Sequence, residues 1–228
     1  MKMHVTTSLL TSLLTLLAGC AAPGANDPVD TDKAVSAARF DAVIQGSFQA
    51  NGPVTLARLT QDETQRFCSD PVRAAGKDFE AARQRIERIN LAAIQWPANG
   101  QYLGDWKQGE QIAQSGRGLT WTDPASEPGF ANGGNCYNCH MIDKKEISFG
   151  TIGPSLWNYG KLRGVTEPAA AAAEPVVKYT WGKIWNSKAY NACSNMPRVG
   201  HMGILTEAQV RDVMALLLDP RSPVNQSP

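Results

Sequence analysis

The stretch "GGNCYNCHM" at residues 133–141 places two cysteines on either side of a two-residue spacer, and a histidine directly follows the second cysteine. Two thiols at this spacing can reach both vinyl groups of one porphyrin, and the adjacent histidine then meets the iron. A Cys-x-x-Cys-His run is accordingly typical of covalent haem attachment. We therefore predict that Cys136 and Cys139 bind one haem c covalently and that His140 is an iron ligand.

Two other interpretations of the same cysteines are a zinc half-site and a redox-active dithiol. A zinc site would need a second Cys or His pair nearby, and a thioredoxin-like centre would need a βαβ setting. The sequence shows neither pattern. Covalent haem attachment is therefore the preferred interpretation of these cysteines.

The first twenty residues, "MKMHVTTSLLTSLLTLLAGC", have the pattern of an export signal, with Lys2, a Leu-rich apolar run and a small-residue exit. The apolar run is too short, and too interrupted by Thr and Ser, for a membrane span. Its exit resembles a bacterial lipobox, in which Cys20 becomes the lipidated first residue of the mature chain. An ordinary cleaved signal that discards Cys20 is the alternative. We expect a periplasmic protein that a lipid anchor attaches to a membrane.

Export makes the number of cysteines informative, because oxidising compartments favour disulfides. The chain has five cysteines. If Cys20 is lipidated and Cys136 and Cys139 bind haem, Cys68 and Cys193 remain, and parity predicts a disulfide between them. The alternative is two unrelated buried thiols, since free Cys packs well as a small apolar residue.

The rest of the chain is organised into a tether and two helical regions. Its 228 residues carry a formal charge of +1, which gives no reason to expect a nucleic-acid partner. After the signal at 1–20, residues 21–56 form a tether and irregular segment, residues 57–100 a helical N-terminal extension, and residues 101–228 the haem-binding domain. Because no alternating run is long enough for a sheet, we expect an all-α fold.

Apolar residues at helical spacing predict three buried helix faces. The faces comprise Phe79, Ala82, Ile86 and Ile89; Trp106, Gly109, Ile112 and Ala113; and Val210, Val213, Met214 and Leu217. Thr206 is the expected N-cap of the last helix, with Gln209 completing a capping box. The low-complexity run "TEPAAAAAEP" at 166–175 is expected to be a surface insertion, because prolines flank its alanines. A helix formed by these alanines is the alternative. Four large aromatic residues are candidates for the contact surface with a partner, but packing in the core or the haem pocket is the stronger expectation for each: Trp157, Tyr159, Trp181 and Trp185.

Three longer stretches resemble SoxX, the monohaem subunit of the SoxAX cytochrome complex of bacterial thiosulfate oxidation. They are "GDWKQGEQIAQSGRGLTW", "GGNCYNCHMIDKKEISFGTIGPSLWNYGKLRG" and "KIWNSKAYNACSNMPRVGHMGILTEAQVRDVMALLLDPRSPVNQ". Together they lie within residues 104–226. The resemblance implies a class I-like c-type cytochrome domain preceded by an N-terminal helical extension. The alanine-rich insertion and the lipobox depart from the pattern of many members.

The resemblance also implies a function. In that family SoxAX joins thiosulfate oxidatively to a cysteine of the carrier SoxYZ, which is an L-cysteine S-thiosulfotransferase reaction that releases two electrons. The chemistry is expected on the partner SoxA, and no catalytic residue is expected in this chain. Its role would be to pass electrons on to a soluble cytochrome c. The alternatives are a free-standing periplasmic electron carrier and a haem enzyme or gas sensor with an open iron position.

The resemblance to c-type cytochromes implies further site residues. In these proteins a Gly-Pro-x-Leu stretch follows the haem motif, and in "GTIGPSLW" the Pro154 carbonyl would accept the histidine ring proton while Leu156 packs on the porphyrin. An ordinary Gly-Pro turn is the alternative. In the resembling family "NMPR" aligns with the methionine ligand, so we expect Met196 to be the distal ligand. Pro197 supports this assignment because it fixes φ and favours an extended loop. His201 is the main rival.

Overall fold

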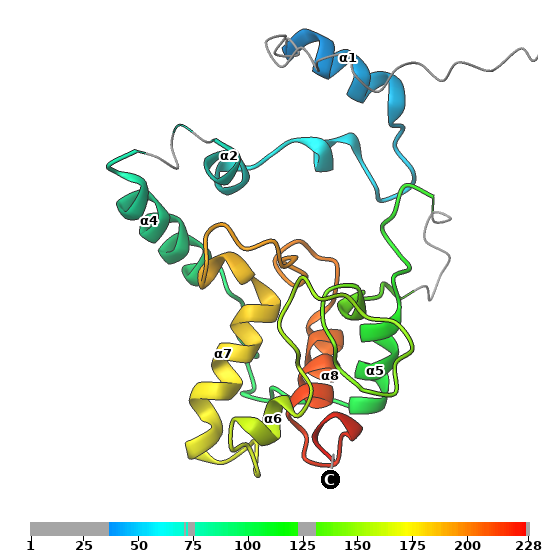
Figure 1. The fold of residues 1–228 in the computed structure, drawn as a ribbon, viewed down its shortest axis with the longest axis vertical. Coiled ribbons are helices and arrows are strands. Elements are labelled where there is room, and N and C mark those ends of the chain that lie inside the picture. Colours follow the sequence, from blue (N-terminus) through cyan, green and yellow to red (C-terminus); the bar gives the residue numbers. More distant parts are fainter. Residues whose placement is uncertain (1–36, 71, 73–75, 123–130, 227–228) are drawn as a thin grey trace, which may run out of the picture. The chain divides into compact units, whose positions relative to one another are not determined.

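The computed structural model of the chain describes residues 37–70, 72, 76–122 and 131–226. All regular structure in these residues is helical, and an isolated antiparallel bridge between Asn51 and Val54 is their only β feature. The all-α prediction is therefore confirmed. The helices are α1 (Ala37–Ser47), α2 (Glu63–Ser69), α4 (Phe79–Ala92), α5 (Trp106–Gln114), α6 (Tyr159–Leu162), α7 (Glu174–Trp185) and α8 (Glu207–Leu218) (Figure 1). Residues 44–228 form one compact unit, which carries every feature discussed below.

The N-terminal extension is more broken than the sequence predicted. A short 3₁₀ turn, Leu56–Leu59, precedes α2, and the chain between them is not helical. Asp62 explains the interruption, because it is the extended N-cap of α2: its side chain accepts a hydrogen bond from the Gln65 amide, and the Gln65 side chain accepts one from the Asp62 amide. This capping box sets the start of the helix at Glu63.

Helix α4 buries a face slightly different from the predicted one. Ile86 is buried as expected, but Ile89 is 52% exposed, so its predicted place in the core is wrong. Asn90, one turn after Ile86, points inward instead and accepts a hydrogen bond of 3.0 Å from the Asn186 side chain. The buried face of α4 therefore includes Ile86 and Asn90, which lie one helical turn apart. A polar residue can occupy the second position because Asn186 provides its hydrogen-bond partner.

Helices α5 and α8 pack against one another and form the centre of the predicted haem-binding domain. Their contact is close because of Gly109, where a Cβ would lie 2.1 Å from the Asp212 carbonyl oxygen. Helix α8 begins as predicted: Thr206 is its N-cap, and Gln209 completes the capping box. The four residues predicted to be buried on α8, Val210, Val213, Met214 and Leu217, are all buried.

Helix α7 was not predicted from the sequence. Its buried residues, Val177, Thr180, Trp181, Gly182, Ile184 and Trp185, extend around much of the helix, so no single apolar stripe marks it. The run at 166–175 is mostly exposed and ends in a 3₁₀ turn, Ala171–Ala173, that leads directly into α7. The predicted insertion is therefore too long by two residues. Pro175 lies in the first turn of α7, where the missing N–H costs no hydrogen bond.

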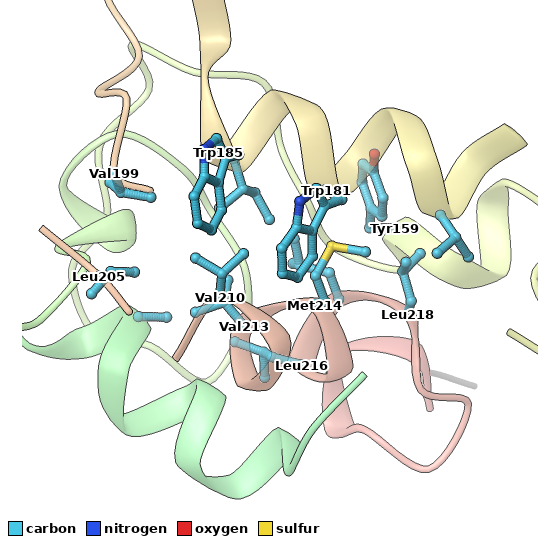
Figure 2. Close-up of a cluster of buried hydrophobic side chains, with 14 of the residues drawn as sticks. Tyr159, Trp181, Trp185, Val199, Leu205, Val210, Val213, Met214, Leu216 and Leu218 are labelled. Carbon is cyan, nitrogen blue, oxygen red and sulfur yellow. The ribbon is translucent and has the colours of Figure 1, made fainter. Parts of the chain in front are cut away.

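The main core lies between α7 and α8 (Figure 2). Trp181 and Trp185 of α7 stack with ring centroids 5.6 Å apart, and Val210 and Met214 of α8 lie on the other side of the contact. The Trp181 indole donates a hydrogen bond of 2.8 Å to the Gln95 carbonyl, which follows α4. Core packing of the two tryptophans is confirmed, and the extension reaches this core.

A second, smaller core joins the extension to the loop after α7. Phe67 of α2, Ile86 of α4 and Ala192 of the loop are its buried members. Phe67 and Phe79 stack at 5.1 Å between ring centroids. This cluster places the extension beside residues 191–198, which contain the predicted distal ligand.

Candidate haem site

The two cysteines of the haem motif and the following histidine lie on one tight turn. A 3₁₀ turn runs over Cys136–Asn138, and Asn135 before it has a left-handed conformation with φ of 51°. The amides of Cys139 and His140 both donate to the Cys136 carbonyl, at 3.1 and 2.9 Å. The motif is therefore folded locally, and neither cysteine is in a disulfide.

A second loop fixes the orientation of the His140 ring. Its Nδ1 lies 2.7 Å from the Pro154 carbonyl oxygen. A carbonyl can only accept, so Nδ1 carries the proton and Nε2 keeps the free lone pair that a metal requires. This is the usual outer contact of a metal-binding histidine, and it identifies Nε2 as the atom that can bind iron.

Gly153 makes this arrangement sterically possible. A Cβ at this position would lie 2.2 Å from His140 Cε1, so any side chain would displace the imidazole. The Gly153 amide also donates to the Cys139 carbonyl at 2.7 Å. Sequence reasoning did not identify Gly153, although its position directly before Pro154 was a signal that could have found it.

Leu156 continues the same loop. Its amide donates to the Met141 carbonyl at 2.8 Å, so residues 153–156 run alongside the haem motif. Leu156 is half-buried against the main core, as are Cys136 and Met196. The structure thus brings three predicted site residues to the border of one core, and contact of Leu156 with a porphyrin stays a prediction.

The donor set fits covalent haem better than the alternative sites. Burial, with a smaller contribution from the neighbouring Cys139, raises the pKa of the Cys136 thiol to about 12. A redox-active dithiol instead needs a lowered thiol pKa. Among the described residues no three His, Cys, Asp or Glu side chains are grouped so as to hold a metal ion, which leaves a zinc half-site without its other ligands.

The loop at 191–198 presents Met196 in a half-buried position. Its carbonyl accepts a hydrogen bond of 2.5 Å from the Ser187 hydroxyl, and its amide donates to the Ser194 hydroxyl at 3.2 Å. These bonds hold the backbone on both sides of the Met196 side chain. Ligation of iron by Met196 stays a prediction that this position permits.

The rival ligands have less suitable surroundings. His201 is exposed, and its amide donates to the Trp185 carbonyl at 3.0 Å. Met202 is 53% exposed, and Met141 directly follows His140 in the chain. Among these four side chains, Met196 combines partial burial with packing on the same core as Cys136 and Leu156.

Cys68 and Cys193 are joined by a disulfide, with an S–S distance of 2.07 Å and a Cα–Cα distance of 5.4 Å. The bond connects α2 to the loop that carries Met196 and spans 125 residues of sequence. Cys20, the predicted lipidation site, and the predicted signal at 1–20 lie outside the described residues.

Comparison with known proteins places the haem motif in a recognised domain. The cytochrome c family matches residues 128–219, which lie inside the predicted domain at 101–228 and include Cys136, Cys139, His140 and Met196. A protein of Aquifex aeolicus (strain VF5), named an uncharacterized lipoprotein, is 36% identical over 170 residues, covering 75% of each chain. Members of this family bind haem c covalently. On the local fold of the motif and on the family match, the chain carries a cytochrome c domain at residues 128–219.

Proposed function

We propose that the chain is the haem-bearing electron-transfer subunit of a SoxAX-type L-cysteine S-thiosulfotransferase. The observation that carries this proposal is the resemblance to SoxX in three stretches within residues 104–226. These stretches extend well beyond the haem motif, which every c-type cytochrome shares. They include α5, α8 and the loop that carries Met196.

Different residues of the chain would hold the porphyrin and the iron of the haem. Cys136 and Cys139 would hold the haem through thioether bonds, and His140 would bind the iron through Nε2 while Pro154 keeps its ring in place. Met196 would close the opposite face. When bound, the haem supplies a reversible one-electron change between ferric and ferrous iron. With both His140 and Met196 bound to it, the iron would offer no position to a substrate, which would suit electron transfer.

The proposed reaction takes place on the partner. A cysteine thiolate of the SoxYZ carrier and thiosulfate form a sulfur–sulfur bond, giving a cysteine S-thiosulfonate and two electrons. The haem-bearing subunit SoxA would carry out this step. This chain would form a heterodimer with SoxA, accept the electrons singly and pass them to a soluble cytochrome c, and no residue of the chain is assigned a catalytic role.

The proposed location is the periplasm, with attachment to a membrane through lipid on Cys20. The name of the Aquifex relative, a lipoprotein, supports the lipobox interpretation of residues 17–20. Among the described helices, none is both long and apolar enough to cross a membrane. The proposed lipid on Cys20 would supply several acyl chains on one residue, which exceed what stable anchoring requires.

A free-standing periplasmic electron carrier is the second candidate function. It is favoured by the cytochrome c match at 128–219, which accounts for haem binding without reference to any partner. The two candidates make different demands on the rest of the molecule. A solitary carrier requires no stable complex, whereas the subunit requires a second haem protein.

Purification of the native protein from thiosulfate-grown cells tests the proposal. We expect a second haem-bearing chain to co-purify, and the haem of this chain to become reduced when thiosulfate and the carrier protein are both added. Omitting the carrier should prevent the reduction. Recovery of this chain without a haem-bearing partner, together with no thiosulfate-dependent reduction, would favour the free-standing carrier.

A further inference from the structure

The loop that carries Met196 is held from outside the matched cytochrome c domain. We define residues 191–198 as the Met196 loop. Before Met196, Cys193 is bonded to Cys68 of α2, and the Ala192 amide donates to Glu87 Oε1 of α4 at 3.1 Å. These two contacts come from residues that precede the match at 128–219.

A third contact follows Met196. The Arg198 guanidinium donates to Asp62 Oδ2 at 2.5 Å, and Asp62 is the N-cap of α2. The Arg198 side chain is only 8% exposed. Asp62 is therefore the counter-ion of a buried charge on the Met196 loop, and a buried cation that loses its partner must regain water by moving.

Asp62 compensates the charge of a second buried cation in addition to that of Arg198. Lys188 is also buried, and its positive charge lowers the pKa of Asp62. Burial has the largest effect on the pKa of Lys188 and lowers it, and the charge of Arg198 lowers it further. Without Asp62 the two cations would face one another with less compensation. The carboxylate of the extension therefore stabilises the local position of both Lys188 and Arg198.

Apolar packing also holds the Met196 loop against the extension. Ala192 is completely buried in the small core formed with Phe67 and Ile86. The Met196 loop thus contacts the extension through a covalent bond, a hydrogen bond, an ion pair and an apolar cluster. Within the domain, the Ser187 hydroxyl donates to the Met196 carbonyl, and the Met202 amide donates to the Arg198 carbonyl at 2.9 Å. The Asn191 amide also donates to the Ser187 carbonyl at 3.3 Å.

From these contacts we infer that the N-terminal extension positions the distal ligand. Asp62, Cys68 and Glu87 are positioning residues: they keep the Met196 loop in place, so that the sulfur stays on the iron. A thioether is an uncharged donor, and its bond to iron depends on how firmly the loop that carries it is held. The inference rests on ligation by Met196, which is part of the proposed function.

The test uses the full-length holoprotein and a variant that alters one contact. Asp62→Asn removes the charge, but Asn remains a good N-cap for α2. Glu63→Gln is the matched control, because Glu63 is the next residue and its exposed ion pair with Arg85 joins α2 to α4 without touching the Met196 loop. The double variant Cys68→Ser/Cys193→Ser removes the covalent contact.

Three readouts report on the ligand rather than on folding alone. They are the weak sulfur-to-iron charge-transfer band of the oxidised protein, the rate of carbon monoxide binding to the reduced protein, and the reduction potential. Losing a charge-assisted hydrogen bond should raise the population with displaced methionine about tenfold in Asp62→Asn. The band should weaken, carbon monoxide should bind about tenfold faster, and the potential should fall. Glu63→Gln should match the wild type.

Met196→Ala separates failure of this inference from failure of the ligand assignment. If Met196→Ala keeps the charge-transfer band, the assignment of Met196 is wrong and the inference falls with it. If Met196→Ala loses the band while Asp62→Asn retains the wild-type band, carbon monoxide rate and potential, the ligand stands and the positioning role is overturned. Should the double cysteine variant fail to fold, Asp62→Asn decides alone.

Discussion

The two sides of the candidate haem site are built in different ways. On the proximal side, the contacts of His140 come from within a segment of less than twenty-five residues: the turn at Cys136 and the loop that contains Gly153 and Pro154. On the distal side, the loop around Met196 depends on Asp62, which lies 136 residues from Arg198 in sequence.

The difference concerns what each side requires in order to form. Local hydrogen bonds and a short loop need little loop-closure entropy, so the proximal side can form as a unit. The distal side needs the extension to be folded and docked first. We therefore expect perturbations of the extension to affect the distal ligand and global stability while leaving covalent haem attachment intact.

The largest expected effect is that of removing the disulfide. Cross-linking residues 125 positions apart restricts the unfolded chain strongly. We expect Cys68→Ser/Cys193→Ser to lower the free energy of unfolding by about 4 kcal/mol, within the range known for native disulfides. Denaturant unfolding of the purified holoprotein measures this loss.

Haem content is the internal control for that variant, because Cys136 and Cys139 belong to the proximal side. It should equal the wild-type value. A loss of stability below about 1 kcal/mol would show that the extension is held mainly by its other contacts.

On the proximal side, Gly153→Ala should have the next largest effect. The new Cβ would collide with the His140 ring, and overpacking of this kind costs about 3 kcal/mol when the neighbours cannot move away. We expect a low yield of holoprotein with an altered haem spectrum. Gly46→Ala is the matched control, since a Cβ at Gly46 has no atom within 4 Å. Normal haem incorporation in Gly153→Ala would contradict the proximal geometry described above.

A smaller effect is expected from acid acting on Asp62. Burial raises the pKa of Asp62, but hydrogen bonds from the Gln65 amide and the Arg198 guanidinium, with the charges of Arg198 and Lys188, outweigh it and hold the pKa below its ordinary 3.8. A carboxylate with a lowered folded-state pKa contributes stability above its unfolded pKa and loses it as the pH falls through the folded value. Partial burial of the His201 ring, and then the charge of Arg198, lower the pKa of His201, and the charge of Asp62 acts in the opposite direction.

Comparison of wild type with Asp62→Asn by denaturation at several pH values measures this contribution. Because Asp62 is partly exposed, we expect a difference of about 1 kcal/mol at neutral pH. The difference should shrink toward zero as the pH falls below 3.8. A difference that does not change with pH would mean that the charge of Asp62 has no part in it.

The sequence predicted features whose determinants are close together in the chain. The Cys-x-x-Cys-His spacing, the Thr206 capping box and the apolar face of α8 each lie within a few residues, and the structure contains all three. The cysteine pair is an exception, because parity reduced the choices without any knowledge of distance. The pairing of Cys68 with Cys193 is nevertheless present.

What the sequence did not predict depends on partners far along the chain. Helix α7 is buried around much of its surface, so periodicity could not mark it. Ile89 and Asn90 exchange expected positions because Asn186 lies opposite. The contacts of Asp62 with Arg198 and of Glu87 with Ala192 join residues more than a hundred positions apart, so no local sequence pattern predicts them.

Substitution of the two rival distal ligands tests the central claim most directly. The oxidised holoprotein should show a weak sulfur-to-iron(III) charge-transfer band at the red edge of its spectrum. Met196→Ala should abolish this band and open the reduced iron to carbon monoxide, because no other side chain closes that face in our assignment. His201→Ala should leave both properties unchanged. Loss of ligation in His201→Ala with a normal Met196→Ala variant would contradict the account and assign the distal position to His201.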